Sequence, residues 1–140
     1  MIEKADIETR EFKSRDFEDI IFDLTKELEL KNYKITKISN IGKIKERTGM
    51  KKDLTVTFQY YKIVEFCNLF TCSEIIMSDF RAGAFMPQRF AVYQPLNKES
   101  IFVSFLKPTS IARLFDSERM MKTSLTVEKD MDDVLSALKD

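Results

Sequence analysis

Two segments, QRFAVYQ at residues 88–94 and SIFVSFL at residues 100–106, decide the fold. Large apolar residues recur in both with a period of two, which is the spacing of side chains on one face of a β-strand. The connection at 95–99 contains Pro, Asn and charged residues typical of a turn. We therefore predict an antiparallel hairpin, with one apolar face made of Phe90, Val92, Ile101, Val103 and Phe105.

Further strands are expected upstream of this hairpin. Residues 60–66 are rich in β-branched and aromatic side chains, and residues 33–39 show a similar pattern. Residues 2–12 alternate loosely and suit an edge strand, and residues 54–58 could extend into a strand. Two polar stretches separate these elements. We expect a short helix or loop at 42–53 and a loop at 79–87.

Four segments have helical periodicity. The first, 17–28, begins after Ser14 or Asp16 as an N-cap and closes at Asn32 as a left-handed residue. The second follows Asn68 as a cap, a short third opens at Pro108, and the last runs over 118–139. Their inward residues are expected to be Phe17, Ile20, Ile21, Leu24 and Leu28; Leu69, Cys72, Ile75 and Ile76; Ile111, Leu114 and Phe115; and Met120, Val127, Met131, Val134, Leu135 and Leu138.

Strands and helices are grouped along the chain rather than strictly alternating. This order predicts an α+β fold, a two-layer sandwich with helices packed on one face of a mainly antiparallel sheet. The length of 140 residues fits a single domain over 1–140.

Composition excludes several functional classes. Lys and Arg number 23, Asp and Glu number 23, and the formal net charge is zero, so we expect no nucleic-acid partner. No run of about 18 apolar residues could span a membrane, and the first residues lack the apolar region of a signal peptide. The expected location is cytoplasmic. Acidic ends flank a basic middle, which indicates either solvated helix faces or a shallow site for a small anionic ligand.

The absence of histidine is the strongest chemical filter. It excludes Ser-His-Asp and Cys-His catalytic pairs, the His-Glu-x-x-His zinc helix and a histidine haem ligand. A general base would have to be a carboxylate, Lys or Tyr with a shifted pKa. We therefore expect neither a metal nor a cofactor, and we expect a binding protein rather than an enzyme.

The segment 60–108 contains an ordered set of short motifs: Tyr61-Lys62-Ile63, Cys67-Asn68, Asp79, Gly83, Met86-Pro87, Phe90-Ala91-Val92-Tyr93, Ile101 to Ser104, and Pro108. By their order and spacing, the segment resembles a bacterial and archaeal family, domain of unknown function 302. Such a resemblance implies a two-layer α+β domain over about 12–138, often a dimer, with no assigned reaction. The chain differs from the family pattern at Leu69, where members commonly have Pro, and at Gln88, where they often have Cys.

The two cysteines, Cys67 and Cys72, are too few for a disulfide framework or a structural zinc site. With Cys72 on a helix and Cys67 before it, we expect their Cα atoms to lie beyond the reach of a disulfide, about 7 Å. Cys67 precedes a helix N-terminus, where a thiol pKa falls. A reactive thiolate and a buried small apolar residue therefore stay open as alternatives for Cys67.

The candidate ligand-binding residues are Cys67, Asn68, Arg81, Arg89 and Tyr93. If they converge, they form a small polar pocket at one end of the sheet. Our first hypothesis is a non-enzymatic module that binds a ligand or partner through residues 66–90. The alternative is a thiol-dependent enzyme or sulfur carrier that uses Cys67, assisted by Arg81 or Arg89. A homodimer is expected, because the paired Met120-Met121 cannot both face one core.

Overall fold

The computed structural model describes residues 2–43 and 56–140. Its five-stranded sheet has the order β1-β5-β4-β3-β2, and every pair of neighbours is antiparallel. The predicted edge strand and hairpin are confirmed, since β1 lies at one edge and β4 pairs with β5. The strands are β1 (Ile7–Phe12), β2 (Lys34–Asn40), β3 (Phe58–Cys67), β4 (Gln88–Pro95) and β5 (Ile101–Leu106).

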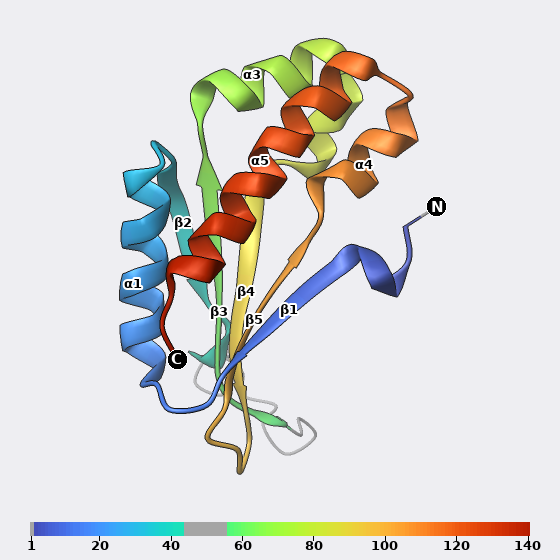
Figure 1. Ribbon diagram of the computed structural model, residues 1–140. Coiled ribbons are helices and arrows are strands. Elements are labelled where there is room, and N and C mark those ends of the chain that lie inside the picture. Colours follow the sequence, from blue (N-terminus) through green and yellow to red (C-terminus); the bar gives the residue numbers. More distant parts are fainter. Residues whose placement is uncertain (1, 44–55) are drawn as a thin grey trace.

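The helices form a second layer on one face of the sheet (Figure 1). In this view α5 crosses the strands diagonally, α1 runs alongside them at the left, and α3 and α4 lie at the upper end. This arrangement confirms the α+β two-layer sandwich. The α-helices are α1 (Phe17–Leu30), α3 (Leu69–Ser78), α4 (Pro108–Phe115) and α5 (Glu118–Ala137), and the 3₁₀ helices are η1 (Lys4–Asp6), η2 (Ile41–Lys43) and η4 (Phe80–Phe85).

Local signals set the ends of α1 as predicted. The Asp16 carboxylate accepts a hydrogen bond from the Asp19 N–H at 3.4 Å, which satisfies one of the unpaired donors at a helix N-terminus. Asn32 follows the helix with a φ of 67° and turns the chain toward β2. Both ends of α1 are therefore set by residues that can be recognised in the sequence, Asp16 as the N-cap and Asn32 as the left-handed residue after the helix.

The main core fills the space between the sheet and the two long helices. Phe90 is fully buried there and stacks on Phe66 with ring centroids 5.3 Å apart. Its other neighbour, Phe105, meets it edge-on at 5.4 Å. The six apolar residues predicted to face inward from the last helix are all buried. The hairpin face and the helical stripe therefore meet as predicted.

A second, smaller cluster joins α3, η4, α4 and α5. Its buried members are Ile75, Ala82, Ala112 and Met120, and Met121 packs against it while partly buried. Both methionines of the pair therefore contact the same cluster, to different depths. The prediction that they cannot both face one core is wrong, so the pair gives no support for a homodimer. This cluster fixes the upper helices to one another and, through α5, to the main core.

Further sequence-based expectations about the fold are wrong. Leu69 is exposed rather than inward, because it is the first residue of α3 and lies outside both core clusters. Leu114 is also exposed. Residues 79–87 are not an irregular loop, since the Asp79 carboxylate accepts from the Arg81 N–H at 2.9 Å and begins η4. The helix or loop expected at 42–53 and the strand expected at 54–58 fall largely on 44–55, outside the described residues. Of the expected strand, only Phe58 is seen as strand, and it is the first residue of β3.

Within 2–43 and 56–140, no helix combines the length and apolar character needed to cross a membrane.

Candidate functional site

The sheet has a second face, turned away from α1 and α5. Because side chains alternate along a strand, the residues between the core positions of each strand point to it. The pairing register arranges them in rows across the strands. We call this surface the second face and define it by Thr9, Glu11, Lys37, Ser39, Tyr61, Ile63, Glu65, Arg89, Ala91, Tyr93, Phe102 and Ser104.

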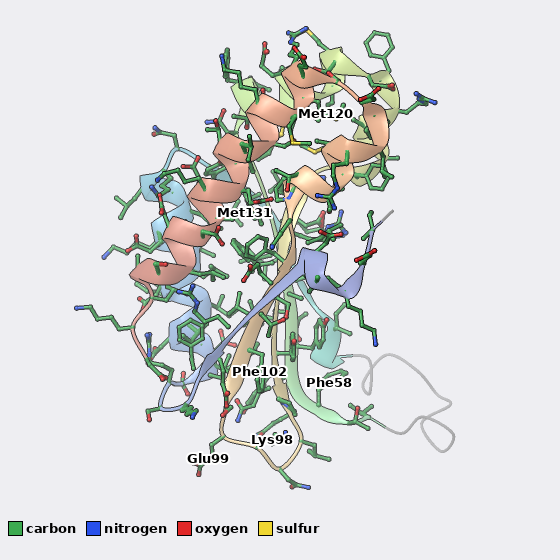
Figure 2. All side chains as sticks on the ribbon, turned by 45° about the vertical axis from the view of Figure 1, so that its right-hand side comes forward. Phe58, Lys98, Glu99, Phe102, Met120 and Met131 are labelled. Carbon is green, nitrogen blue, oxygen red and sulfur yellow. A yellow bond between two sulfur atoms is a disulfide. The ribbon has the colours of Figure 1, made fainter. Side chains whose placement is uncertain are left out.

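An aromatic row crosses the second face. Tyr93 of β4 stacks between Tyr61 of β3, at a centroid distance of 5.3 Å, and Phe102 of β5, at 5.7 Å. Phe58 meets Tyr61 edge-on at 5.5 Å. Phe58 and Phe102 both lie in the lower half of the sheet in Figure 2. Burial in this row, and then the neighbouring Tyr93 hydroxyl, raise the pKa of Tyr61 above its ordinary value.

A chain of hydroxyl groups continues from this row. The Tyr93 hydroxyl and the Ser104 hydroxyl lie 2.8 Å apart, and Ser104 is also 2.8 Å from the Thr9 hydroxyl. A hydroxyl can donate one hydrogen bond and accept others, so Ser104 can serve both neighbours at once. The chain fixes the Tyr93 ring and links the central strand to the edge strand β1.

Charged residues stand on the margins of the second face. In the register, Glu65 lies between Lys37 of β2 and Arg89 of β4. At the opposite corner, the Glu11 carboxylate accepts a hydrogen bond from the Ser100 hydroxyl at 2.6 Å. Two acids and two bases therefore surround a centre that is apolar and aromatic.

A cleft of about 290 Å³ lies beside Arg89, where β4 and β5 meet η4 and α4. Its wall includes Phe85, Pro87, Leu106 and Ile111, and Arg89 supplies the cationic group. The Arg89 guanidinium donates one hydrogen bond to the Pro87 carbonyl at 3.3 Å. Since a guanidinium carries five N–H donors, this bond orients the group and leaves further donors for an anion.

The cysteines overturn one expectation. Cys67 and Cys72 are joined by a disulfide, with their Cα atoms 6.5 Å apart, inside the range in which a bridge can form. The prediction failed because α3 begins only two residues after Cys67, so its first turn brings Cys72 back toward the end of β3. Asn68 caps α3 as expected, since its side chain accepts from the Thr71 N–H at 3.1 Å.

The five candidate site residues come from β3, the N-cap of α3, η4 and β4. Cys67 and Asn68 lie at the junction of β3 and α3, and Arg89 and Tyr93 lie on the same face of β4. Arg81 lies in η4, where Asp79 binds its guanidinium through two side-chain hydrogen bonds of 3.0 and 2.8 Å. The same guanidinium stands 5.7 Å from the Phe115 ring centroid. The Arg81 guanidinium is therefore already bound by the carboxylate that begins its own helix.

The Asp79–Arg81 pair gives a titration that can be measured. Hydrogen bonds from the Arg81 side chain and N–H lower the pKa of Asp79 to about 2. We expect Arg81→Gln to raise this pKa toward the ordinary value of 3.8, as followed by NMR titration of the carboxyl carbon. The pair's contribution to stability is complete above pH 3.8 and is lost as the pH falls through about 2.

A matched control for this titration is Arg119→Gln. Arg119 forms a comparable two-bond pair with Glu74, on α3. This change should raise the pKa of Glu74 and leave that of Asp79 in place. An Asp79 pKa that stays near 2 without the Arg81 guanidinium would contradict the assignment.

Sequence reasoning missed much of the second face. Among its aromatic residues only Tyr93 is a predicted site residue, whereas Tyr61, Phe102 and the hydroxyls of Thr9 and Ser104 are not. The available signal was the same alternation that identified the core, read for the opposite face.

In the described ranges, 2–43 and 56–140, no three His, Cys, Asp or Glu residues are grouped so as to hold a metal ion.

Comparison with protein families matches residues 9–138 to "Domain of unknown function DUF302". The chain belongs to this family. A solved structure of an uncharacterized conserved DUF302 protein from Bacillus stearothermophilus superposes with a TM-score of 0.80. The two chains are 18% identical, and the match covers 94% of this chain and 96% of the other. This likeness shows a shared DUF302 fold, and comparison with curated proteins gave no significant match.

Proposed function

We propose that this DUF302 chain, as a single domain over 1–140, is a non-enzymatic binding module that works as a homodimer through the second face. The observation that carries the proposal is the apolar and aromatic centre of that face, on the side of the sheet away from α1 and α5. Large contiguous apolar surfaces with polar margins are typical of protein interfaces. The occupant that fits best is a second copy of the same chain.

The register supports a self-complementary contact. In a twofold dimer, each residue i of one copy meets residue j of the other, and the reverse. A twofold axis that runs between β3 and β4 would place Tyr61 on Tyr93 of the second copy. It would also place Ile63 on Ala91 of the second copy, a large side chain against a small one. The two acids and two bases on the margins sum to zero, so the two faces do not repel one another.

The same proposal includes a small anionic ligand in the cleft beside Arg89. This arginine lies inside the segment 66–90 and on the margin of the second face, so a bound anion would touch the edge of the dimer contact. A carboxylate or phosphate group suits the fork of N–H donors on a guanidinium. The apolar cleft wall would hold the remainder of the ligand.

The dimer can be tested with Tyr93→Glu. An unpaired charge at the centre of an interface costs about 3–5 kcal/mol, so we expect the dissociation constant to rise by about 100-fold or more. Sedimentation velocity should show the wild-type chain as a dimer and the variant as a monomer. The control is Phe22→Glu, which replaces an aromatic residue that is 64% exposed on α1, in the helical layer.

Each result decides the proposal. A wild-type chain that is monomeric at micromolar concentration, or a Tyr93→Glu variant as dimeric as Phe22→Glu, contradicts a dimer through the second face. Native mass spectrometry of gently purified wild-type and Arg89→Gln protein tests the ligand. An anionic adduct lost in the variant supports the cleft, and bare protein in both spectra counts against it.

A further inference from the structure

The disulfide lies at the junction of β3 and α3, and it forms a short ring. Cys67 is the last residue of β3, Cys72 lies in the first turns of α3, and the two are five positions apart. We propose that this bond is a thiol–disulfide exchange site for a protein that carries a dithiol. The proposal does not rest on the homodimer, because Tyr93 and the aromatic row are not part of it.

The bond is not needed to hold its own segment in place. Closing so short a ring removes little chain entropy from the unfolded state, so the stabilisation it adds is at the low end for disulfides. Asn68, inside the ring, already fixes the segment. Its Oδ1 accepts from the Thr71 N–H at 3.1 Å, and its Nδ2 donates to the Asn32 carbonyl at 3.0 Å. Reduction should therefore leave the junction of β3 and α3 folded.

The two sulfur atoms differ in accessibility. Cys67 is partly exposed, whereas Cys72 is 8% exposed. An incoming thiolate can therefore reach Cys67 Sγ, and Cys72 Sγ becomes the leaving group. Cys72 lies near the N-terminal end of α3, where the helix dipole favours a thiolate. The more exposed sulfur is therefore the one attacked, and the sulfur near the helix N-terminus is the one that leaves as a thiolate.

The chain between the two cysteines offers a docking surface. Leu69 and Phe70 are 83% and 73% exposed, although both are large apolar residues. They lie inside the disulfide ring itself, so a protein that covers them brings its own thiol close to Cys67. A small thiol reagent would gain nothing from this contact. The arrangement therefore favours a protein dithiol as the reductant.

The exchange balances in two steps. The partner's thiolate attacks Cys67 Sγ, the bond between Cys67 and Cys72 breaks, and Cys72 leaves as a thiolate that takes up a proton. The partner's second thiol loses its proton and attacks the partner's own sulfur in the mixed disulfide, which releases Cys67 as a thiol. This chain is reduced by two electrons and two protons, and the partner's dithiol is oxidised to a disulfide.

The test compares two reductants on the full-length protein, thioredoxin and dithiothreitol, with thiols counted by alkylation and mass spectrometry. Burial of an exposed Phe is worth about 1.5–3 kcal/mol, so Phe70→Ser should slow reduction by thioredoxin about tenfold or more. It should leave reduction by dithiothreitol unchanged within about twofold. The control is Phe80→Ser, because Phe80 is 84% exposed but lies in η4, outside the ring.

Three outcomes overturn the proposal. They are resistance of the oxidised protein to excess thioredoxin, loss of the far-ultraviolet circular dichroism spectrum on reduction, and equal slowing by Phe70→Ser and Phe80→Ser. The order of attack has its own test. The Cys67 thiol in Cys72→Ser should be alkylated faster than the Cys72 thiol in Cys67→Ser, and the reverse order would contradict attack at Cys67.

Discussion

Replacing Phe90 by Ala should lower the free energy of unfolding by about 3–5 kcal/mol. Phe90 is fully buried at the centre of the sheet, stacked on Phe66 and in edge contact with Phe105. The smaller side chain loses both the transfer of a ring from water and its packing partners, and it leaves a cavity that strands on either side cannot close. Equilibrium unfolding in urea, followed by circular dichroism, measures the change.

Phe102→Ala is the matched comparison on the other face of the same hairpin. Phe102 is partly exposed and stacks on Tyr93, so its loss should cost about 1–2 kcal/mol. Measurements at two protein concentrations separate any contribution of dimerisation, which depends on concentration. Equal losses for Phe90→Ala and Phe102→Ala would contradict the assignment of one face to the core and the other to the second face.

Met131→Ala should lower the free energy of unfolding by about 2–5 kcal/mol. Met131 lies at the middle of α5, is fully buried, and belongs to the core cluster between that helix and the sheet (Figure 2). Removing its side chain loosens the main contact between the two layers. Thermal and urea unfolding of the same samples should agree on the loss.

Two other methionine substitutions test the cause. Met131→Leu nearly conserves volume, so it should cost less than about 1.5 kcal/mol. Met77→Ala removes a side chain that is 55% exposed on α3, and its effect should stay within about 0.5 kcal/mol. If Met77→Ala lowered the free energy of unfolding as much as Met131→Ala, burial of the side chain would not explain the loss.

The fold was largely predictable because burial is periodic in this chain. The alternation at 88–94 and 100–106 and the helical stripe ending at Leu138 each record which side faces the core. Both signals are local, and each holds over several repeats. Asp16 and Asn32 added the ends of α1, since capping chemistry depends on one or two residues.

The errors fall where local pattern and tertiary position disagree. Leu69 satisfies the helical spacing of α3 but occupies its first position, outside both core clusters. The disulfide depends on how quickly the chain turns after β3, which no spacing rule specifies. At 79–87, Gly83 and Pro87 suggested an irregular loop, whereas the Asp79 side chain starts a 3₁₀ helix.

The candidate site was less predictable than the fold. Tyr93 was named from the sequence, yet its partners Tyr61 and Phe102 come from two other strands. Their meeting depends on the register of three strands, which the sequence does not give directly. The sequence gives no reason to prefer Arg81 or Arg89 as the cation of the site. The structure shows that Arg81 already forms an ion pair with Asp79.

The pairing of β1 with β5 has a consequence for synthesis on the ribosome. Thr9 and Ser104 are hydrogen-bonded partners separated by 95 positions. At about 5–20 residues per second, β1 waits roughly 5–20 seconds for its partner strand to be made. During that interval the backbone N–H and C=O groups of β1 have no partner strand, so this edge of the sheet cannot close before β5 has been made.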